Sequence, residues 1–355
     1  NSTEEGWERM INHVDATTGF LETMFNRIGR RMPAPVDSKE SFLQWRVQAK
    51  ELFRSLLGLQ QMKKCAPLPL VYEKMEIGNG LVRERVILQT ESDAWMPFFI
   101  LRDSAQRKKH PAVILPPVDG VGKFGVIDSS EYAFFQKLAP KEREKYQEKW
   151  DFAAELARNG FLVVAPDLRG TGERREWMDE GEEHFARSSR RPVNNVALYL
   201  GQCLAGINVW EIGCLADYLR DRQDCSGEIS IGGENEAGVT ALYCAAAQEG
   251  YSKVFMMGMF AGFQKNALRI ANQSCETYVP SLMLWFDMCD IVSMQTAGKI
   301  LIQTMNHGEE SGDVDEQAKR VQEALAICGE SVGFKCIHTT RQEMRGNCLD
   351  FLRKK

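Results

Sequence analysis

From His110 to the C-terminus, short apolar runs alternate with helical patterns, and this alternation constrains the fold more than any other feature of the chain. The apolar runs cover residues 112–115, 161–165, 228–232, 254–259, 300–305 and 334–338. Helical patterns lie between them at residues 149–158, 203–219, 237–247, 315–327 and 344–352. Strands that are apolar throughout are typical of a parallel sheet whose two faces are both covered by crossover helices. We therefore predict an α/β fold with a mostly parallel, doubly wound sheet.

The chain before His110 has a different pattern of polar and apolar residues. Residues 82–90 alternate apolar and polar side chains, and residues 96–101 form a short apolar run, so both are predicted as antiparallel strands at the start of the sheet. Upstream, apolar residues recur at helical spacing on either side of Pro33 and Pro35. We expect a helical extension over residues 1–66 that packs on an α/β domain over residues 67–355. An insertion at about residues 168–200 is charged and aperiodic, and either shapes a binding site or forms a solvated loop.

Composition excludes several classes of function. The 355 residues are 44% hydrophobic and 26% charged, which is typical of a globular protein. A net charge of -5 gives no reason to expect a nucleic-acid partner, which normally requires a basic face. The strongly apolar run at residues 254–263 is too short to span a bilayer, which takes roughly 20 residues. The ten cysteines form no CxxC pair and are expected as buried thiols, so neither a metal, another cofactor nor a disulfide is assigned.

The segment 229–238 reads as a strand, a tight turn and then a helix, with small residues at Gly233, Ala237 and Gly238. This is the layout of a nucleophile elbow, in which close packing of the helix against the strand excludes bulky flanking residues. Asn235 occupies the nucleophile position. Asparagine is one of the few non-glycine residues that tolerate the positive φ of such a turn.

Four stretches in order resemble one family. They are Pro-Asp-Leu-Arg-Gly-Thr-Gly at residues 166–172, Gly-Ile-Asn-Val-Trp-Glu-Ile at 206–212, the elbow, and Phe-Asp-Met-Cys-Asp at 286–290. Together they resemble the acetyl-xylan-esterase-like branch of the α/β-hydrolases, including the esterase-like proteins encoded beside polysaccharide-uptake systems. The resemblance covers about residues 56–352. It implies an α/β-hydrolase fold and a carbohydrate or ester ligand. It also suggests export, whereas cysteines with no expected disulfide favour the opposite.

The resemblance implies a catalytic triad, and two of its positions are substituted here. The family's serine corresponds to Asn235, whose carboxamide is a very poor nucleophile. Its histidine, expected in a turn before the last helix, corresponds to Met344, which cannot relay a proton. Its acid corresponds to Glu310. His338 lies six residues before Met344, inside a strand pattern, and is interpreted as structural. The oxyanion turn is altered as well, because Pro116 and Pro117 have no N–H to donate, which leaves Val118 or Asp119.

Acidic residues suggest a second hypothesis for the same edge of the sheet. If the strand order holds, the side chains that gather there are those of Asp119, Glu234, Glu236, His307, Glu309, Glu310 and Glu343. Paired carboxylates can serve as acid and base toward a glycosidic bond, or with His307 can hold a divalent cation. The simpler alternative is that loops at strand ends are polar anyway.

The leading prediction is a degenerate carbohydrate-esterase-like protein that binds a carbohydrate or ester without serine-esterase activity. The runner-up is an active hydrolase that acts on polysaccharide fragments through Glu234, Glu236 or Glu310, or an atypical esterase. A scaffold with no small-molecule site is the third hypothesis. Two further motifs are interpreted as structural: a buried Asp167–Arg169 pair, and the G-x-G-x-x-G at Gly120, Gly122 and Gly125, expected as a flexible loop beside the pocket rather than a dinucleotide site.

Overall fold

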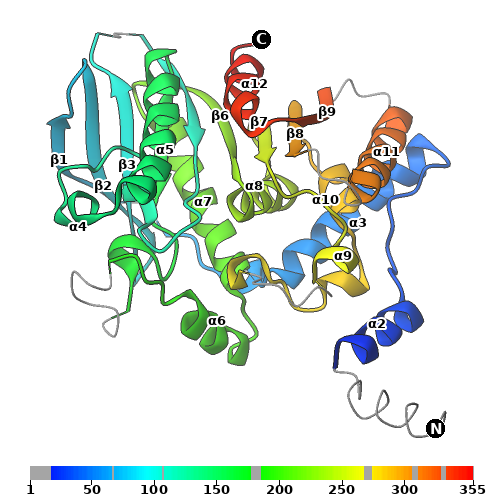
Figure 1. Cartoon of the computed structure of the whole chain (residues 1–355). Helices are drawn as coiled ribbons and strands as arrows, with labels where there is room; N and C mark the ends of the chain where they lie inside the picture. The colour runs from blue at the N-terminus through cyan, green and yellow to red at the C-terminus, as the bar shows by residue number, and fades with distance from the viewer. Residues whose placement is uncertain are drawn as a thin grey trace, which may run out of the picture.

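The computed structural model describes residues 17–65, 68–105, 108–176, 185–267, 274–305, 311–328 and 333–354. One nine-stranded sheet runs through the molecule in the order β1-β2-β3-β5-β4-β6-β7-β8-β9 (Figure 1). The antiparallel part comprises β1 (Pro69–Glu76), β2 (Leu81–Glu91) and β3 (Ala94–Asp103), and β3 also pairs antiparallel with β5. The parallel part comprises β4 (His110–Ile114), β5 (Leu162–Pro166), β6 (Cys225–Glu234), β7 (Tyr251–Met257), β8 (Lys299–Met305) and β9 (Gly333–Thr339). The predicted mostly parallel sheet with antiparallel N-terminal strands is confirmed.

Helices cover both faces of the sheet. The helices are α2 (Thr17–Ile28), α3 (Lys39–Leu56), α4 (Ala133–Lys137), α5 (Pro140–Arg158), α6 (Arg190–Tyr199), α7 (Leu204–Asp221), α8 (Glu236–Ala247), α9 (Phe263–Ala267), α10 (Met288–Ser293), α11 (Ser311–Cys328) and α12 (Arg341–Arg353). Short 3-10 turns are η1 (Leu59–Gln61), η2 (Gly122–Gly125), η3 (Gly172–Arg174), η6 (Cys275–Thr277) and η7 (Leu282–Leu284). In the described ranges, none of the helices combines the length and apolar character that crossing a bilayer demands.

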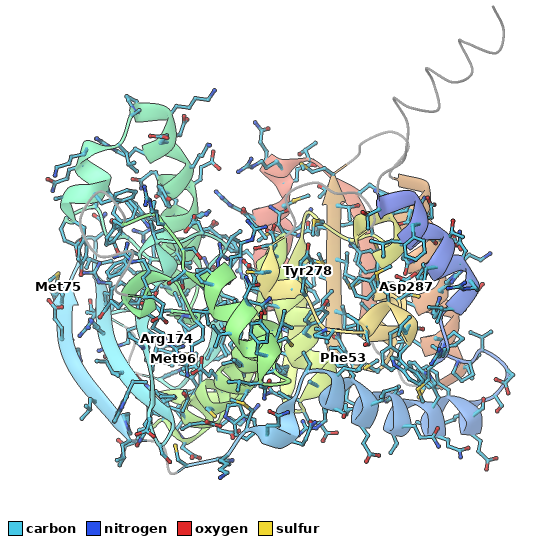
Figure 2. All side chains as sticks on the ribbon, turned by 90° about the horizontal axis from the view of Figure 1, so that it is seen from below. Phe53, Met75, Met96, Arg174, Tyr278 and Asp287 are labelled. Atoms are coloured by element: carbon cyan, nitrogen blue, oxygen red, sulfur yellow. The ribbon has the colours of Figure 1, made fainter. Side chains whose placement is uncertain are left out.

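The sheet separates two hydrophobic cores. The larger core joins residues of α3, α7, α8, α10 and α11 to one face of the sheet. The smaller core joins α5 and α12 to the other face. Strand residues alternate between the two cores, as the period of two in a β-strand requires: Val254 and Met256 face the larger core, whereas Phe255 and Met257 face the smaller one. In Figure 2, Met75 of the edge strand β1 and Asp287 before α10 lie toward opposite sides of the molecule.

The helix α3 is an integral part of the larger core. Ser38 caps its first turn, because the side-chain oxygen accepts a hydrogen bond from the Ser41 N–H. Phe42, Trp45 and Phe53 lie on one face and are buried. Their spacing of three to eight residues places them on a single stripe of the helix, which packs against the sheet domain.

Several elements were not predicted from the sequence, and β1 and α6 illustrate the reasons. The edge strand β1 exposes Leu70 and Val71, so it lacks the alternating pattern of a half-buried strand. The insertion at residues 168–200 was expected to be aperiodic, but it contains the helix α6. Only a narrow face of α6 is buried, at Asn194 and Ala197, and Asn194 accepts a hydrogen bond from the Leu204 N–H at 2.9 Å. A helix that is held mainly by polar contacts carries no apolar repeat that sequence analysis can detect.

Candidate functional site

The sharp turn between β6 and α8 has the geometry of a nucleophile elbow. Asn235 stands alone between the strand and the helix, with φ 48° and ψ −118°. Its N–H donates to the carbonyl of Met257 at 2.7 Å, and its own carbonyl accepts from the Val239 N–H at 3.1 Å. These bonds hold the residue in a sparsely populated backbone conformation, while its side chain remains exposed.

Small residues are required on both sides of this turn. A Cβ added at Gly233 would lie 2.6 Å from the Cβ of Ala237, and one added at Gly238 would lie 2.5 Å from Cγ of Met256. Gly258, at the end of β7, is a third such position, because it has φ +105° and a Cβ there would clash with the Asn235 Oδ1. The sequence identified the first two glycines. It missed Gly258, which lies within the apolar run at residues 254–259 that was predicted as a strand.

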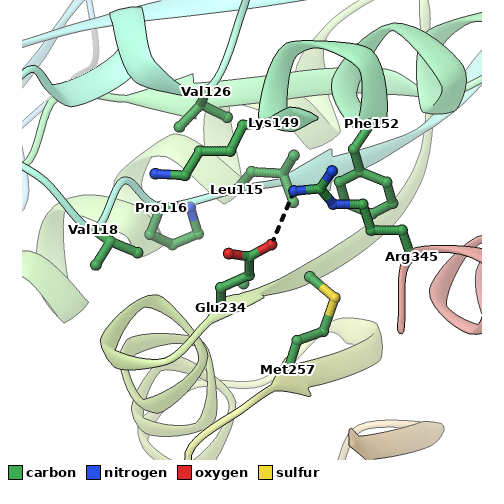
Figure 3. A pocket seen from close by; sticks show the side chains of 10 residues that line it. Leu115, Pro116, Val118, Val126, Lys149, Phe152, Glu234, Met257 and Arg345 are labelled. Carbon is green, nitrogen blue, oxygen red and sulfur yellow. Dashed lines mark hydrogen bonds and ion pairs between the residues drawn. The ribbon is translucent and has the colours of Figure 1, made fainter. Parts of the chain in front are cut away.

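A pocket opens beside the elbow (Figure 3). Its volume is about 440 Å³, including its open mouth. The side chains in Figure 3 come from the loop after β4, from η2 and α5, and from the ends of β6 and β7 and the start of α12. The lining residues are Leu115, Pro116, Val118, Val126, Lys149, Phe152, Gly233, Glu234, Met257 and Arg345.

Three ion pairs involve basic residues that line this pocket. Lys149 Nζ lies 3.0 Å from Asp119 Oδ2. Arg345 Nη2 lies 3.4 Å from Glu234 Oε1 and 3.5 Å from Glu148 Oε2. The site therefore combines an apolar floor with paired charges at its rim. Sequence analysis identified Asp119 and Glu234 but not the cations, because a lysine or arginine on an amphipathic helix gives no sign that it faces a pocket.

The position of Met344 corrects one expectation. The resemblance places the family's histidine in a turn before the last helix, but α12 begins at Arg341, so Met344 lies within the helix. The helix starts early because Thr340 and Glu343 form a capping box. The Met344 side chain is buried in the smaller core, and its carbonyl accepts from Gln303 Nε2 at 2.9 Å.

The described histidines lie away from the elbow. In the strand register His338 of β9 pairs with Thr304 of β8, and β9 is three strands from β6, which is roughly 14 Å across the sheet. Its ring nitrogens are 3.0 Å from Thr304 Oγ1 and 2.8 Å from Asp315 Oδ1. His110 begins β4 and so lies at the amino ends of the parallel strands, away from the edge that carries the elbow, and its Nδ1 is 3.0 Å from the Gly160 carbonyl oxygen.

The predicted acidic set is only partly described. Glu234 ends β6 and Glu236 begins α8, so the two carboxylates flank Asn235 at the elbow, and both are half-buried. Asp119 lies across the pocket, where it pairs with Lys149. His307, Glu309 and Glu310 lie outside the described residues. Within the ranges that the structure describes, no group of three or more histidine, cysteine, aspartate and glutamate side chains is placed to hold a metal ion.

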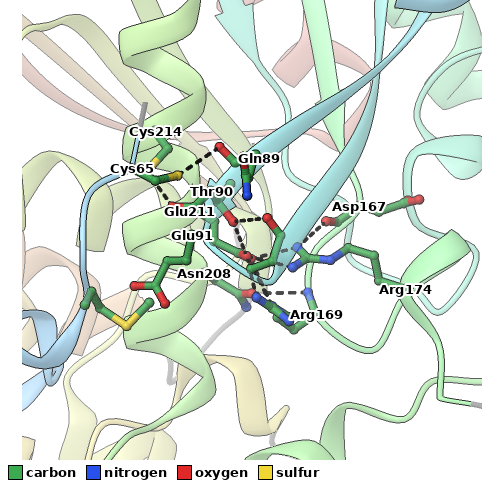
Figure 4. A network of polar contacts seen from close by, with 12 residues as sticks. Cys65, Gln89, Thr90, Glu91, Asp167, Arg169, Arg174, Asn208, Glu211 and Cys214 are labelled. Carbon is green, nitrogen blue, oxygen red and sulfur yellow. Dashed lines mark hydrogen bonds and ion pairs between the residues drawn. The ribbon is translucent and has the colours of Figure 1, made fainter. Parts of the chain in front are cut away.

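The expected Asp167–Arg169 pair is wrong, because each residue has another partner (Figure 4). Arg169 Nη2 lies 2.8 Å from Oε1 of buried Glu211, and Arg174 Nη2 lies 2.7 Å from the same oxygen. Although burial works to raise it, the pKa of Glu211 is lowered to about 2 by these two guanidinium groups. Arg169 therefore has the structural role that was predicted, with Glu211 as its partner.

Asp167 instead pairs with a lysine from the glycine-rich segment. Lys123 Nζ lies 2.5 Å from Asp167 Oδ2, and both side chains are fully buried. The segment at residues 120–125 was expected as a flexible loop, but residues 122–125 form the buried 3-10 turn η2. A lysine that is buried against two aromatic rings, Phe99 and Phe124, fixes this turn in place.

The described part of the insertion lies behind the pocket. Arg190 donates to the Val118 carbonyl at 2.9 Å and pairs with buried Glu276. A Cβ at Gly120 would clash with the Ala186 carbonyl. The insertion thus contacts the loop that carries Val118 and Asp119, although none of the ten residues that line the pocket belongs to it.

The chemistry available in this pocket is limited by its lining. None of the ten lining residues is a serine, threonine, cysteine or histidine. The exposed residue at the elbow carries a carboxamide, which is neither a nucleophile nor a base at neutral pH. The N–H groups in the first turn of α8 lack partners within their own helix, so the turn still presents donors toward a bound oxygen atom.

Comparison with known proteins identifies solved structures that share this fold. No family model and no curated protein match the chain. Solved structures do match. A protein from Bacteroides fragilis described as an acetyl xylan esterase superposes with a TM-score of 0.72 at 17% identity, over 92% of this chain and 83% of that one. A methylesterase superposes with a TM-score of 0.63 at 14% identity, over 96% and 68%.

A third match is a glucuronoyl esterase from Teredinibacter turnerae, with a TM-score of 0.61 at 12% identity over 92% of this chain and 88% of that one. At identities this low, the likeness establishes the fold and not the activity. The predicted fold is confirmed, and the matched structures belong to the same group of carbohydrate esterases that the sequence motifs resemble. The chain has the α/β-hydrolase fold.

Proposed function

We propose that this protein binds a carbohydrate or ester ligand in the strand-end pocket and does not hydrolyse it by a serine-esterase mechanism. The observation that carries the proposal is the elbow, where an asparagine holds the strained φ of 48° at the nucleophile position. A serine mechanism forms an acyl-enzyme at this position, and a carboxamide cannot do so. In this proposal the turn has kept its shape and lost its reactive group.

Among the described residues, neither histidine lies near the elbow, which supports the same proposal. We assign the family's histidine position to Met344, whose thioether cannot accept a proton from a nucleophile. A nucleophilic serine, even if restored, would need such a base to be activated. The loss of both groups is expected to abolish acyl transfer rather than slow it.

Ligand binding is supported by the pocket itself. Its apolar floor, formed by Leu115, Phe152 and Met257, suits the face of a sugar ring or an acyl group. The rim offers charged donors and acceptors at Lys149, Glu234 and Arg345. The solved structures with the same fold are named as acting on acetyl xylan or glucuronoyl esters or as methylesterases, which makes a polysaccharide fragment the ligand class to test first.

The acidic-site hypothesis has less support. A general acid must be free to donate a proton to the ligand, whereas the Glu234 carboxylate is engaged in an ion pair with Arg345. Glu234 and Glu236 also flank the apex on successive elements rather than facing each other across a cleft. We therefore rank it below ligand binding without hydrolysis.

Activity assays test the absence of chemistry. We expect the purified protein to resist labelling by a fluorophosphonate probe and to hydrolyse p-nitrophenyl acetate no faster than a denatured control. Labelling or burst kinetics that vanish on mutation of one specific residue would overturn the proposal. His184 and His307 should be among the residues tested, because both lie outside the described ranges.

Binding assays test the pocket. We expect acetylated xylo-oligosaccharides to raise the melting temperature of the wild-type protein, and Arg345→Ala to weaken this shift. Arg341→Ala is the matched control, because Arg341 lies on the same helix with a side chain that is 67% exposed. If no oligosaccharide, acetylated or not, shifts the melting temperature, the ligand class is wrong. Turnover of a glycan that is lost in Glu234→Gln would instead favour the acidic site.

A further inference from the structure

The linker between the N-terminal helices and β1 is held against α7. The Lys63 N–H donates to Glu91 Oε1 at 2.6 Å, at the end of β2. Lys64 Nζ lies 3.0 Å from Asp217 Oδ2 on α7. These contacts place the next residue, Cys65, between the end of β2 and the helix.

The thiols of Cys65 and Cys214 both lie at the end of β2. Cys65 Sγ contacts the Gln89 carbonyl oxygen at 3.8 Å, and Cys214 Sγ contacts the Thr90 carbonyl oxygen at 3.8 Å. The two carbonyls belong to consecutive residues, where the register of β2 shifts against β3. Figure 4 shows the two labelled cysteines next to each other, one from the linker and one from α7.

We propose that Cys65 and Cys214 form a redox site that closes to a disulfide when a small-molecule disulfide oxidises it. Neither cysteine is in a disulfide in the structure, and both are half-buried. Six of the other cysteines are fully buried, whereas Cys275 and Cys336 lie on η6 and β9, away from the linker.

A cavity opens at Cys214, and Cys65 is itself only half-buried. Cys214 lines a second cavity of about 690 Å³, including its open mouth, between α3, α7 and the start of β7. Lys64, Trp210 and Asp217 line the same cavity. Its position, on the opposite side of the sheet from α5 and α12, keeps it separate from the pocket beside Asn235.

The reaction proceeds by two exchanges. The thiolate of Cys65 attacks one sulfur of oxidised glutathione, forms a mixed disulfide and releases one glutathione thiolate. The thiolate of Cys214 then attacks the sulfur of Cys65 and releases the second glutathione thiolate. Two protein thiols lose their protons to solvent and two electrons to the glutathione disulfide, so the protein is oxidised and glutathione disulfide is reduced.

The second exchange is expected to depend on pH. Burial, with a contribution from nearby carboxylates, raises the pKa of Cys214 to about 12. Since only the thiolate reacts, the rate of ring closure should rise about tenfold for each pH unit between neutral pH and pH 9.

The test is oxidation of the full chain with oxidised glutathione, followed by alkylation and peptide mapping without reduction. We expect one peptide that links Cys65 to Cys214, and its loss in Cys65→Ala and in Cys214→Ala. Cys336→Ala is the matched control, because Cys336 is also half-buried with a thiol pKa raised to about 12, and the link should persist.

The disulfide closes a loop of about 150 residues, so the oxidised protein should melt about 5 °C higher than the reduced one. The difference should be absent in Cys214→Ala. The proposal is overturned if both cysteines are alkylated after oxidation, if the mixed disulfide at Cys65 persists at pH 9, or if either cysteine is linked elsewhere.

Discussion

At the scale of single residues, the elbow keeps the backbone conformation of a nucleophile turn although its central residue, Asn235, has no nucleophilic group. Asn235 has the positive φ that a nucleophile elbow requires, and Gly258 leaves room for its side chain. Asparagine tolerates positive φ better than most residues, but its ψ of −118° lies outside the left-handed region that it prefers. Glycine should therefore occupy this position at a lower conformational cost.

This strain predicts a stability change of known sign. We expect Asn235→Gly to raise the free energy of unfolding by about 1 kcal/mol, and Asn235→Val to lower it by about 2 kcal/mol, because a β-branched residue is penalised most at positive φ. Chemical denaturation with urea measures both. Equal stability of the two variants would show that the elbow relaxes when its side chain changes.

A second residue-scale prediction concerns Gly258. Gly258→Ala adds a methyl group that clashes with Asn235 Oδ1, at a φ of +105° that alanine disfavours. We expect it to lower the free energy of unfolding by about 2 kcal/mol and to weaken ligand binding at the neighbouring pocket. Gly227→Ala, which also has a positive φ but meets no atom within 4 Å, separates the backbone effect from the clash.

At the scale of elements, α3 behaves as part of the hydrophobic core rather than as an appendage. Phe53 is fully buried and stacks edge-on with Tyr243 of α8 and with Phe286. Gly206 of α7 is packed so closely against the Leu57 carbonyl that no side chain fits between them. The N-terminal helix and the sheet domain are therefore expected to unfold together.

The contribution of α3 can be measured with a matched pair of variants. Phe53→Ala removes a buried aromatic ring and should lower the free energy of unfolding by about 3–5 kcal/mol. Val47→Ala, on the same helix, changes a residue that is 70% exposed and should leave stability unchanged within about 0.5 kcal/mol. A single unfolding transition in both variants would support cooperative unfolding, whereas a separate early transition in Phe53→Ala would contradict it.

At the scale of the whole molecule, charge pairs hold the long connections to the sheet. Glu211 of α7 pairs with Arg169 and Arg174, and Glu173 pairs with Lys123 and Arg85. Despite the opposing effect of burial, the basic partners of Glu173 lower its pKa to about 2, the same value as that of Glu211. Both carboxylates are thus more acidic in the folded protein than in the unfolded chain.

This difference predicts how stability responds to acid. An unfolded glutamate has a pKa of about 4.3, so these carboxylates stabilise the fold above that pH, and the stabilisation is lost as the pH falls toward 2. We expect the melting temperature to decline steeply between pH 4.5 and pH 2. Glu211→Gln should be less stable at pH 7 and should show a smaller decline, which thermal melts across this pH range measure. An unchanged slope would exclude Glu211 as a source of the acid sensitivity.

How much of this structure could be predicted from the sequence depends on what each residue contacts. The parallel strands and their helices were predictable, because buried segments such as residues 161–165 are apolar throughout. The elbow was predictable, because its shape depends on local glycines. The start of α12 had a local signal that was missed, the capping-box spacing of Thr340 and Glu343. The pairing of Arg169 with Glu211 and the helix α6 could not be predicted, because each depends on polar contacts between residues distant in the chain. The cations of the pocket wall, Lys149 and Arg345, could not be distinguished from ordinary surface charges.

The burial of α3 has a practical consequence for proteolysis. A cut in the linker just after Cys65 would break the backbone but leave Phe42, Phe53 and their neighbours sequestered between α8 and α11. The two fragments should therefore co-elute as one particle under native conditions and come apart only in denaturant. A truncated protein that begins at β1 would instead expose the apolar residues of α8 and α11 that α3 covers, and it should aggregate when expressed.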